Sequence, residues 1–391
     1  MNNIHKLYLF SFINSMAFFG AVSIPFFLYW AKLSYVQIFT LEAAYMLLIF
    51  LLEVPTGIVA DRFGRKNSLF LSALAWTGGL LIFGTIPNFF ALLVGEAAMA
   101  LGAALLSGAD KALLYDSLKE MKKTKDSKHF FSRFLLFDSL GVIVAFPIGS
   151  MIAGSSIVPY PQTLPLTFLL AAIPVSLSAL IALSIKEPKR KFNKENFLLL
   201  GIKGIKYFFK HKALRSFGFD MALISSTTFF IYWLYQPILL NAGTGIGVLG
   251  FAAAGFNIFA IILLAKIKKI ENFIGTKRIL FFSALVPALV FLLLSFFKPL
   301  WFALIGIFII FGLRAVRGPL FDSYMNKHIK SGNRATVLSA ISMLQRAIMI
   351  VLYPIVGFLT DISLSTALLV LGMMTLIFAV FAKVDEKHMK K

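Results

Sequence analysis

The sequence predicts an all-α integral membrane protein with twelve transmembrane helices in two pseudo-symmetric six-helix bundles. Composition is the first reason, because 59% of the 391 residues are hydrophobic and only 14% are charged. Soluble domains average about 45–50% apolar and about 25% charged residues. The second reason is a series of apolar runs, each long enough to cross a bilayer. The third is an internal repeat, in which the second half of the chain echoes the first.

The positive charge of the chain is concentrated in particular segments. A net charge of +21 would by itself suit a nucleic-acid-binding protein. Nearly all lysines and arginines, however, fall in segments that we assign to the cytoplasm, whereas Lys32 and Lys298 fall on the other side. This distribution follows the positive-inside rule and predicts a cell-membrane protein with both termini in the cytoplasm. The expected partners at that face are anionic lipid headgroups and not nucleic acid.

The apolar runs also define how the chain is divided. Twelve spans are expected, among them continuous helices over 7–31, 89–117 and 213–240. After the sixth span, lysines alternate with apolar residues in the pattern of a helix that lies on the membrane surface. The predicted domains are a first bundle over 1–187, a cytoplasmic linker with this amphipathic surface helix over 188–212, and a second bundle over 213–391.

Two pairs of segments carry the repeat. Phe26–Trp30 in the first span matches Phe229–Trp233 in the seventh, and Leu114–Ser117 closing the fourth span matches Leu320–Ser323 closing the tenth. Parallel repeats of six helices are a layout of membrane transporters in which the substrate site lies between the repeats near mid-membrane. The sequence therefore predicts a central site shared by the two bundles.

The most specific stretch is Gly57–Lys66, a charged turn between the second and third spans. Gly64 can adopt the positive φ that a tight turn needs, and Gly57 permits a close approach of two helices. The stretch resembles the G-x-x-x-D-x-x-G-R-K/R signature of the major facilitator superfamily, with every anchor position filled. This resemblance implies a transporter whose two halves rock around a central site.

The resemblance also implies a latch at the cytoplasmic face. Asp116 is expected to reach Arg62 or Arg65, and Asp322 to reach Lys277 or Arg278. The alternative is a set of unlinked surface ion pairs, each worth under about 1 kcal/mol. The gate and latch candidates are Gly57, Asp61, Arg62, Gly64, Arg65, Lys66, Asp116, Lys277, Asp322 and Arg334.

A second resemblance lies just before this turn. The segment Glu53–Gly57 is similar to the E-x-P-T-G sequence of a drug:H⁺ antiporter branch of the superfamily, which includes tetracycline- and macrolide-efflux-like members. The similarity implies a proton-binding role for Glu53, with packing near the inner gate as the alternative.

Ionisable side chains within the apolar runs are the remaining candidates, because a charge in lipid is costly unless it faces a cavity or a partner. Asp110, Lys111 and Asp138 are predicted to share one layer. A Lys111–Asp138 ion pair would leave Asp110 to carry protons, and a static neutralised network is the alternative. The proton-coupling candidates are Asp110, Asp138, Asp220 and Glu53.

The arginines allow two interpretations. Together with Asp220, Arg314 and Arg317 can close the cavity through ion pairs that cross between the two halves. Alternatively, Arg314, Arg317 and Arg346 can hold an anionic substrate, which guanidinium groups bind bidentately. Aromatic residues beside the same spans suit an amphipathic ligand, although they can equally face lipid. The substrate-cavity candidates are Glu96, Lys111, Arg314, Arg317, Arg346, Phe26, Trp30, Phe230 and Trp233.

We therefore expect a monomeric secondary transporter that exports a small amphipathic or drug-like compound, driven by the proton gradient. The alternatives are a carrier for an anionic metabolite and a membrane receptor or scaffold that does not transport. We expect no enzymatic activity and no cofactor, because the sequence contains no G-x-x-x-x-G-K-[ST] loop for ATP and no nucleophile–base grouping. The lack of cysteine excludes disulfides and thiolate metal sites.

Overall fold

The computed structural model describes residues 2–188, 208–210, 212–328 and 334–381, which are helical and contain no strand. The chain divides into two compact units. The N-terminal unit comprises Met1–Lys194 together with Gly245–Ala254, and the C-terminal unit comprises Glu195–Thr244 and Gly255–Lys391. The predicted surface helix of the linker lies outside the described residues.

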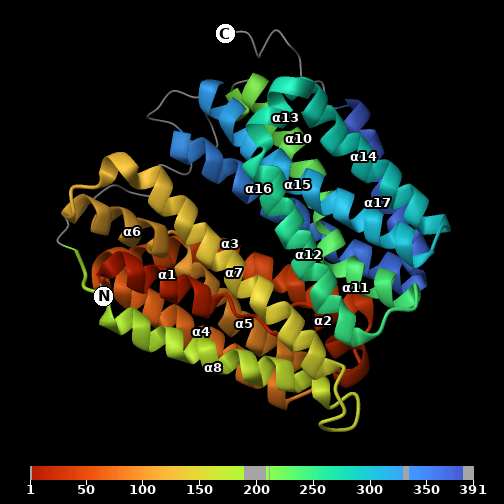
Figure 1. Cartoon of the computed structure of the whole chain (residues 1–391), viewed down its shortest axis with the longest axis horizontal. Helices are drawn as coiled ribbons and strands as arrows, with labels where there is room; N and C mark the ends of the chain where they lie inside the picture. Colours follow the sequence, from red (N-terminus) through yellow and green to blue (C-terminus); the bar gives the residue numbers. More distant parts are fainter. Residues whose placement is uncertain (1, 189–207, 211, 329–333, 382–391) are drawn as a thin grey trace. The chain divides into compact units, whose positions relative to one another are not determined.

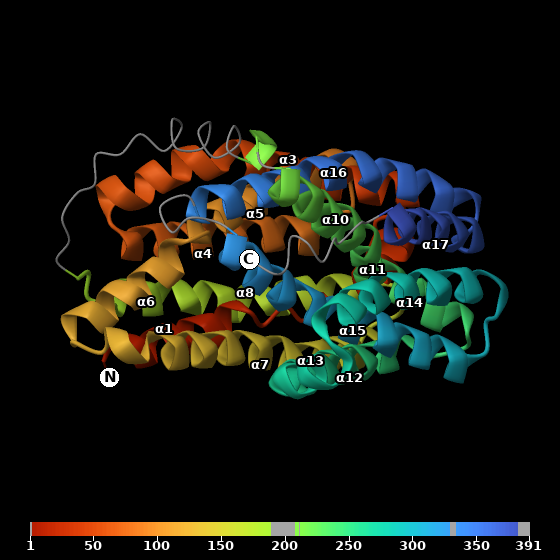
Figure 2. The ribbon, with the colours of Figure 1, turned by 90° about the horizontal axis from the view of Figure 1, so that it is seen from above.

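The N-terminal unit is a bundle of long helices with two interrupted spans. In it, α4 packs between α5 and α8, and α1 lies beside α7 and α8 (Figures 1 and 2). Its elements are α1 (Asn3–Asn14), α2 (Ser23–Pro25), the π-helical turn η1 (Phe26–Trp30), α3 (Tyr35–Phe63), α4 (Arg65–Thr85), α5 (Phe89–Leu106), α6 (Ala109–Glu120), the 3₁₀ turn η2 (Thr124–Asp126), α7 (Ser127–Ala153) and α8 (Thr163–Ser184).

The first span is not the continuous helix predicted over 7–31. It stops at Asn14, runs without regular helix to Val22, and resumes as α2 and η1. Two glycines of α7 explain how this irregular chain fits. A Cβ at Gly141 would overlap the carbonyl oxygen of Phe12, and one at Gly149 would overlap that of Phe18. The backbones of α7 and the first span therefore touch directly, a contact that only small residues permit.

The fourth span is also interrupted, which corrects the continuous helix predicted over 89–117. Helix α5 ends at Leu106, Gly108 has a φ of +77°, and α6 begins at Ala109. Such a φ suits glycine, which has no Cβ to clash. A break inside a membrane-spanning segment leaves carbonyl groups that must find other donors.

Hydroxyl groups from neighbouring helices provide these donors. Ser68 of α4 donates a hydrogen bond of 2.6 Å to the carbonyl of Leu105, and Thr56 of α3 donates one of 3.0 Å to that of Ala104. Both hydroxyl-bearing residues are buried. The end of α5 is thus bonded to two other helices of its unit, which makes the interruption a stable part of the fold.

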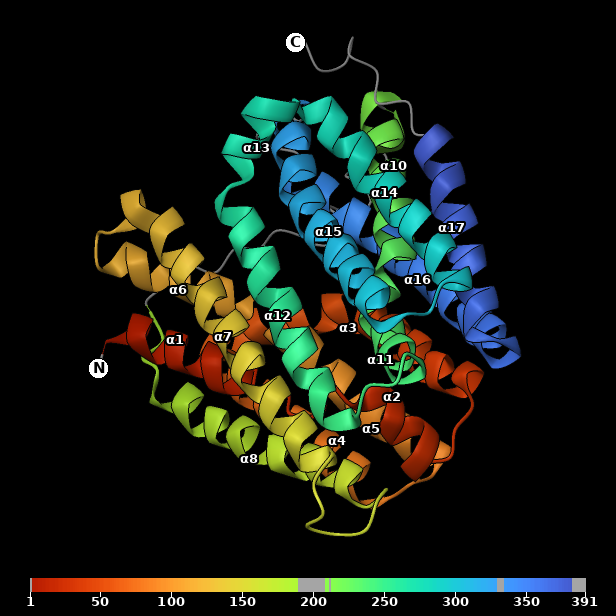
Figure 3. The same ribbon diagram turned by 45° about the vertical axis from the view of Figure 1, so that its right-hand side comes forward.

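The C-terminal unit contains the second set of helices. In it, α14 packs against α15 and α17, and α10 packs against α16 (Figure 3). Its elements are α10 (Lys212–Phe229), α11 (Ile231–Asn241), α13 (Ile267–Ile274), α14 (Thr276–Phe296), α15 (Leu300–His328), α16 (Arg334–Ile362) and α17 (Leu364–Phe381). Helix α12 (Ile246–Ala265) begins in the N-terminal unit and ends in this one.

The seventh span is interrupted at Phe230, between α10 and α11, and so departs from the continuous helix predicted over 213–240. Phe230 itself is fully buried. Across the described residues, ten helical segments are long and apolar enough to cross a membrane. The other two predicted spans correspond to the interrupted first span and to α17, whose apolar stretch is shorter. The all-α membrane fold is therefore confirmed.

Candidate functional site

The N-terminal unit contains a cavity of about 440 Å³ at the level where both of its interrupted spans lose helical structure. Residues of the first-span break, of the Ser107–Gly108 break and of α7 meet there. The lining residues are Asn14, Ser15, Ala17, Phe19, Trp76, Leu80, Ala103, Leu106, Ser107, Gly108, Asp110, Lys111, Asp138, Val142 and Val175. The sequence predicted the charged members of this set, with Lys111 as a cavity residue, but it placed the cavity between the two bundles.

Three ionisable side chains face this cavity. Asp110 and Lys111 lie in the first turn of α6, and the Asp110 carboxylate accepts a 2.6 Å hydrogen bond from the backbone N–H of Lys111. Asp138 of α7 accepts a hydrogen bond from the Ser15 hydroxyl in the first-span break. The three groups are thus brought into one layer, as predicted.

The predicted ion pair between Lys111 and Asp138 is absent from the salt bridges of the described residues. The span is interrupted at Gly108 just before Lys111, and Asp138 bonds Ser15 instead. The side chains of Lys111 and Asp138 are exposed. The cavity therefore holds two carboxylates and one ammonium group, none of them joined in a contact ion pair within the described chain.

The charges of the C-terminal unit are arranged differently. Arg317 of α15 is 2% exposed and forms a 2.6 Å ion pair with Asp220 of α10. Its guanidinium group also donates 2.7 Å hydrogen bonds to the carbonyl of Leu280 and the hydroxyl of Ser283. Asp220 and Arg317 belong to one unit and pair with each other, so the predicted ion pairs with the other half are not formed by these two residues. Arg317 is a neutralised core residue.

Arg314 lies one turn before Arg317 and forms no ion pair with a described carboxylate. Its guanidinium carbon is 4.9 Å from the ring centroid of Phe229 and 4.9 Å from that of Tyr232. These rings lie on either side of the interruption at Phe230. The two arginines, which the sequence treated alike, therefore have different surroundings.

The charged turn after α3 is built as the sequence predicted. Gly64 has a φ of +102°, and Arg65 forms an ion pair with Asp116 at the end of the fourth span. The sequence analysis missed Glu187. Its carboxylate accepts hydrogen bonds from the backbone N–H groups of Arg65 (3.0 Å) and Lys66 (2.9 Å), and so caps α4. A carboxylate directly after the sixth span, where helix ends meet, was the available signal.

The other latch candidates are spread over several helices. Within the N-terminal unit, no atom lies within 4 Å of where a Cβ of Gly57 would be, so the predicted close helix approach there is absent. Arg62 lies 5.9 Å from the ring of Phe63. Glu53 and Asp61 lie on α3, and Lys277 lies exposed in the first turn of α14. The side chains of Asp322 and Arg334 lie outside the described residues.

The remaining cavity candidates are largely buried. Phe26 is fully buried and packs against Trp30 and Phe168, with ring centroids 4.9 and 4.1 Å apart. Phe230 packs against Tyr353 at 5.3 Å. These phenylalanines are packing residues and do not line the cavity.

Three further candidates lie elsewhere. Glu96 of α5 is 4% exposed and interacts electrostatically with the buried Glu42 of α3. Trp233 lies on α11 and Arg346 on α16. None of these three residues lines the N-terminal cavity.

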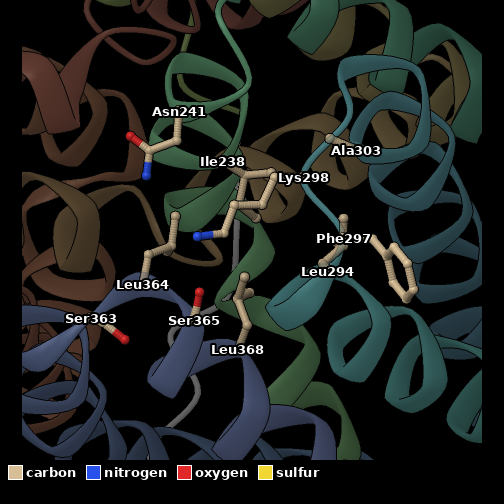
Figure 4. Close-up of a pocket in the computed structure, with 10 residues that line it drawn as sticks. All are labelled: Ile238, Asn241, Leu294, Phe297, Lys298, Ala303, Ser363, Leu364, Ser365 and Leu368. Carbon is tan, nitrogen blue, oxygen red and sulfur yellow. The ribbon is translucent and has the colours of Figure 1, made fainter.

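A smaller cavity of about 210 Å³ lies in the C-terminal unit (Figure 4). Its polar lining comes from Asn241, Lys298, Ser363 and Ser365, which lie at the ends of helices and in the connections between them. No predicted site residue lines it. The N-terminal cavity, with its charged lining and two helix breaks, is therefore the stronger candidate site.

A helical membrane fold with a charged cavity at interrupted helices is typical of membrane transporters. Residues 7–352 match the Major Facilitator Superfamily, and the chain belongs to this family. A stretch of 73 residues is 34% identical to an uncharacterized transporter from Buchnera aphidicola subsp. Schizaphis graminum (strain Sg). That match covers 19% of this chain and 18% of the relative.

Solved structures show the same fold. The nucleoside transporter NupG is 15% identical, with a TM-score of 0.81 and full coverage of both chains (100% and 100%). A POT family transporter in complex with 5-aminolevulinic acid is 13% identical, with a TM-score of 0.79 and coverage of 99% of this chain and 96% of that one. A bacterial homolog of the human lysosomal transporter Spinster is 15% identical, with a TM-score of 0.76 and coverage of 97% of this chain and 94% of that one. At these identities the likeness concerns the fold.

Proposed function

We propose that this transporter exports a small amphipathic compound in exchange for protons, by alternating access. The observation that carries the proposal is the N-terminal cavity, where Asp110, Lys111 and Asp138 line a space between interrupted helices. Ionisable groups at membrane depth that face a cavity mark ion and proton pathways. Interrupted helices are where such transporters place their coupling and substrate sites.

In this proposal Asp110 is the proton carrier. When Asp110 is protonated, Lys111 and Asp138 leave the cavity with no net charge, and when it is ionised the cavity carries one negative charge. A ligand or a conformational change that favours one of these charges is coupled to the proton by the same free energy. Asp138, held by Ser15, is the second carboxylate of the site.

The contact between Arg65 and Asp116 is the proposed cytoplasmic latch. Glu187 supports it by capping the first turn of α4, which carries Arg65. Lys277, Asp322 and Arg334 are proposed to act at the corresponding place in the second half. Because the Arg65–Asp116 pair is partly exposed, breaking it has a modest free-energy cost of about 1 kcal/mol or less, as a reversible latch requires.

The direction and the compound class rest on the similarity of Glu53–Gly57 to drug-exporting members of the superfamily. We further propose a monomer in the cell membrane, with both termini in the cytoplasm and anionic lipids at that face. The alternative of a receptor without transport predicts ligand binding but no flux.

The test uses proteoliposomes loaded with radiolabelled probes and diluted into more acidic buffer. The probes are naphthalene-2-sulfonamide, naphthalene-2-sulfonate, uridine and dialanine, which cover a neutral and an anionic amphipathic compound, a nucleoside and a peptide. We expect the inward proton gradient to accelerate exit of at least one naphthalene probe and a protonophore to abolish this acceleration. In Asp110→Asn the acceleration should fall at least tenfold.

Asp126→Asn is the matched control, because Asp126 is an exposed aspartate in the turn before α7. It should respond to the gradient as the wild type does. Full acceleration in Asp110→Asn would refute its role as proton carrier. Wild-type flux that ignores the gradient would refute proton coupling, and binding without flux would favour the receptor.

A further inference from the structure

We propose that Arg314 receives an oxyanion group of the transported compound, so that the preferred substrates are amphipathic organic anions with an aromatic or otherwise apolar body. This inference rests on the proposed transport function and names its substrate class. It replaces the broader idea that Arg314, Arg317 and Arg346 act together.

The first argument is that Arg314 has no carboxylate of its own. No described Asp or Glu forms a salt bridge with it, and its Nε lies buried without a hydrogen-bond partner in the described structure. Asp220, the buried acid of the same unit, is bonded to Arg317. An uncompensated cation at membrane depth is costly, and such costs are retained where the charge serves a ligand.

The second argument is the geometry of the surrounding rings. Phe229 and Tyr232 each lie 4.9 Å from the guanidinium carbon. Aromatic faces stabilise a cation without using its in-plane N–H groups. The Tyr232 side chain also accepts a hydrogen bond from the Arg314 guanidinium group. The remaining N–H groups are donors for the two oxygens of a carboxylate, sulfonate or phosphate, which guanidinium binds as a fork.

The third argument is access. The side chain of Arg314 is only half-buried, whereas that of Arg317 is 2% exposed. Helices α10, α11 and α15 pack together in the C-terminal unit (Figure 3), and the interruption of the seventh span lies beside Arg314. A ligand that reaches the guanidinium group would displace no internal ion pair.

The neighbouring side chains indicate the body of the ligand. The ring of Tyr232 packs on Phe311 at 4.5 Å, and Phe229 packs on Tyr353 at 6.5 Å. Flat apolar surfaces next to one cation match a compound with an aromatic or apolar body and a single anionic group. A small hydrophilic dianion would leave these rings unused.

The experiment compares two probes that differ in charge. Binding of naphthalene-2-sulfonate and naphthalene-2-sulfonamide to the detergent-solubilised full chain is measured by isothermal titration calorimetry, with 2-naphthyl phosphate as a second oxyanion. We expect the wild type to bind the sulfonate at least tenfold more tightly than the sulfonamide. Arg314→Gln should reduce this ratio to about one, mainly by weakening sulfonate binding.

Two further variants keep the test decisive. Arg314→Lys retains the charge but loses the fork, and should give an intermediate ratio even if Arg314→Gln fails to fold. Arg215→Gln changes an exposed arginine of α10 and should keep the wild-type ratio. Preference for the phosphate over the sulfonate assigns the site to phosphorylated compounds within the same chemistry.

Equal wild-type affinity for the charged and the neutral probe would overturn the inference, and so would an unchanged ratio in Arg314→Gln. Either result leaves the proposed function standing if the neutral sulfonamide is exported in a gradient-dependent way. Conversely, loss of charge preference in Arg314→Gln together with gradient-independent flux would support the substrate class and refute the proton coupling.

Discussion

Lys111 and Arg317 occupy equivalent positions in the two repeats, each five residues before an aspartate near the end of its span. Their surroundings are opposite. The Lys111 side chain is exposed at a cavity and forms no ion pair in the described chain, whereas Arg317 is enclosed by Asp220, a hydroxyl and a carbonyl. In the second repeat this cation is a buried packing residue, and in the first repeat it is exposed. Two related halves can therefore divide structure and chemistry between them.

The largest test of this contrast is Asp220→Ala. Removing one partner of a buried ion pair leaves the other charge uncompensated and typically costs about 3–5 kcal/mol. We expect a strongly lowered melting temperature in detergent, measured by intrinsic tryptophan fluorescence.

The double variant Asp220→Leu with Arg317→Met supplies the control for this prediction. Replacing the whole pair with apolar side chains leaves no buried charge, so the melting temperature should recover most of the loss. A normal melting temperature in Asp220→Ala would mean that the Arg317 pair is not structural, and the contrast would fail.

An intermediate effect is expected at the helix break of the N-terminal unit. Ser68→Ala removes the hydroxyl that bonds the Leu105 carbonyl, and a buried acceptor without its donor costs about 1–3 kcal/mol. Ser132→Ala is the matched control, because Ser132 is exposed and bonds only within its own helix. Equal melting temperatures for the two variants would show that hydrogen bonds do not stabilise the break.

The smallest effect is expected for Lys111→Gln. An exposed side chain without an ion partner contributes little to folding, so its removal should change the free energy of unfolding by no more than about 0.5 kcal/mol. The same variant should alter gradient-driven export, because Lys111 is the one cation among the described residues that line the cavity. A destabilisation similar to that of Asp220→Ala would erase the distinction between the two repeats.

Hydropathy was sufficient to predict the helical membrane fold, because it is a local pattern. The Arg65–Asp116 contact joins residues far apart in the sequence, and it was one of the two alternatives that the family resemblance of the charged turn implied. The pairing of Arg317 with Asp220 inside one unit was not predicted, since which faces of two helices meet is decided by packing. The absence of the Lys111–Asp138 pair has a cause in the neighbouring sequence. Ser107–Gly108 is a turn-favouring dipeptide, and reading it as one would have predicted the interruption before α6.

The irregular stretch after Asn14 was harder to foresee. Its apolar residues continue the hydropathy of a membrane span, while Asn14, Ser15 and Gly20 weaken the helix only slightly each. What allows the break is the bare backbone of α7 at Gly141 and Gly149, more than a hundred residues away. Such a contact is not encoded in any local pattern of the first span.

Helix α6 carries Asp110 in its first turn and Asp116 less than two turns further on, a separation of about 9 Å along the axis. The end of α5 is bonded to its neighbours through Leu105 and Ala104, so Gly108 lies between a fixed helix end and the short helix α6. Any tilt of α6 about Gly108 moves the cavity carboxylate and the Arg65 contact together. The twelve residues of α6 therefore couple the cavity carboxylate to the ion pair at the end of the span.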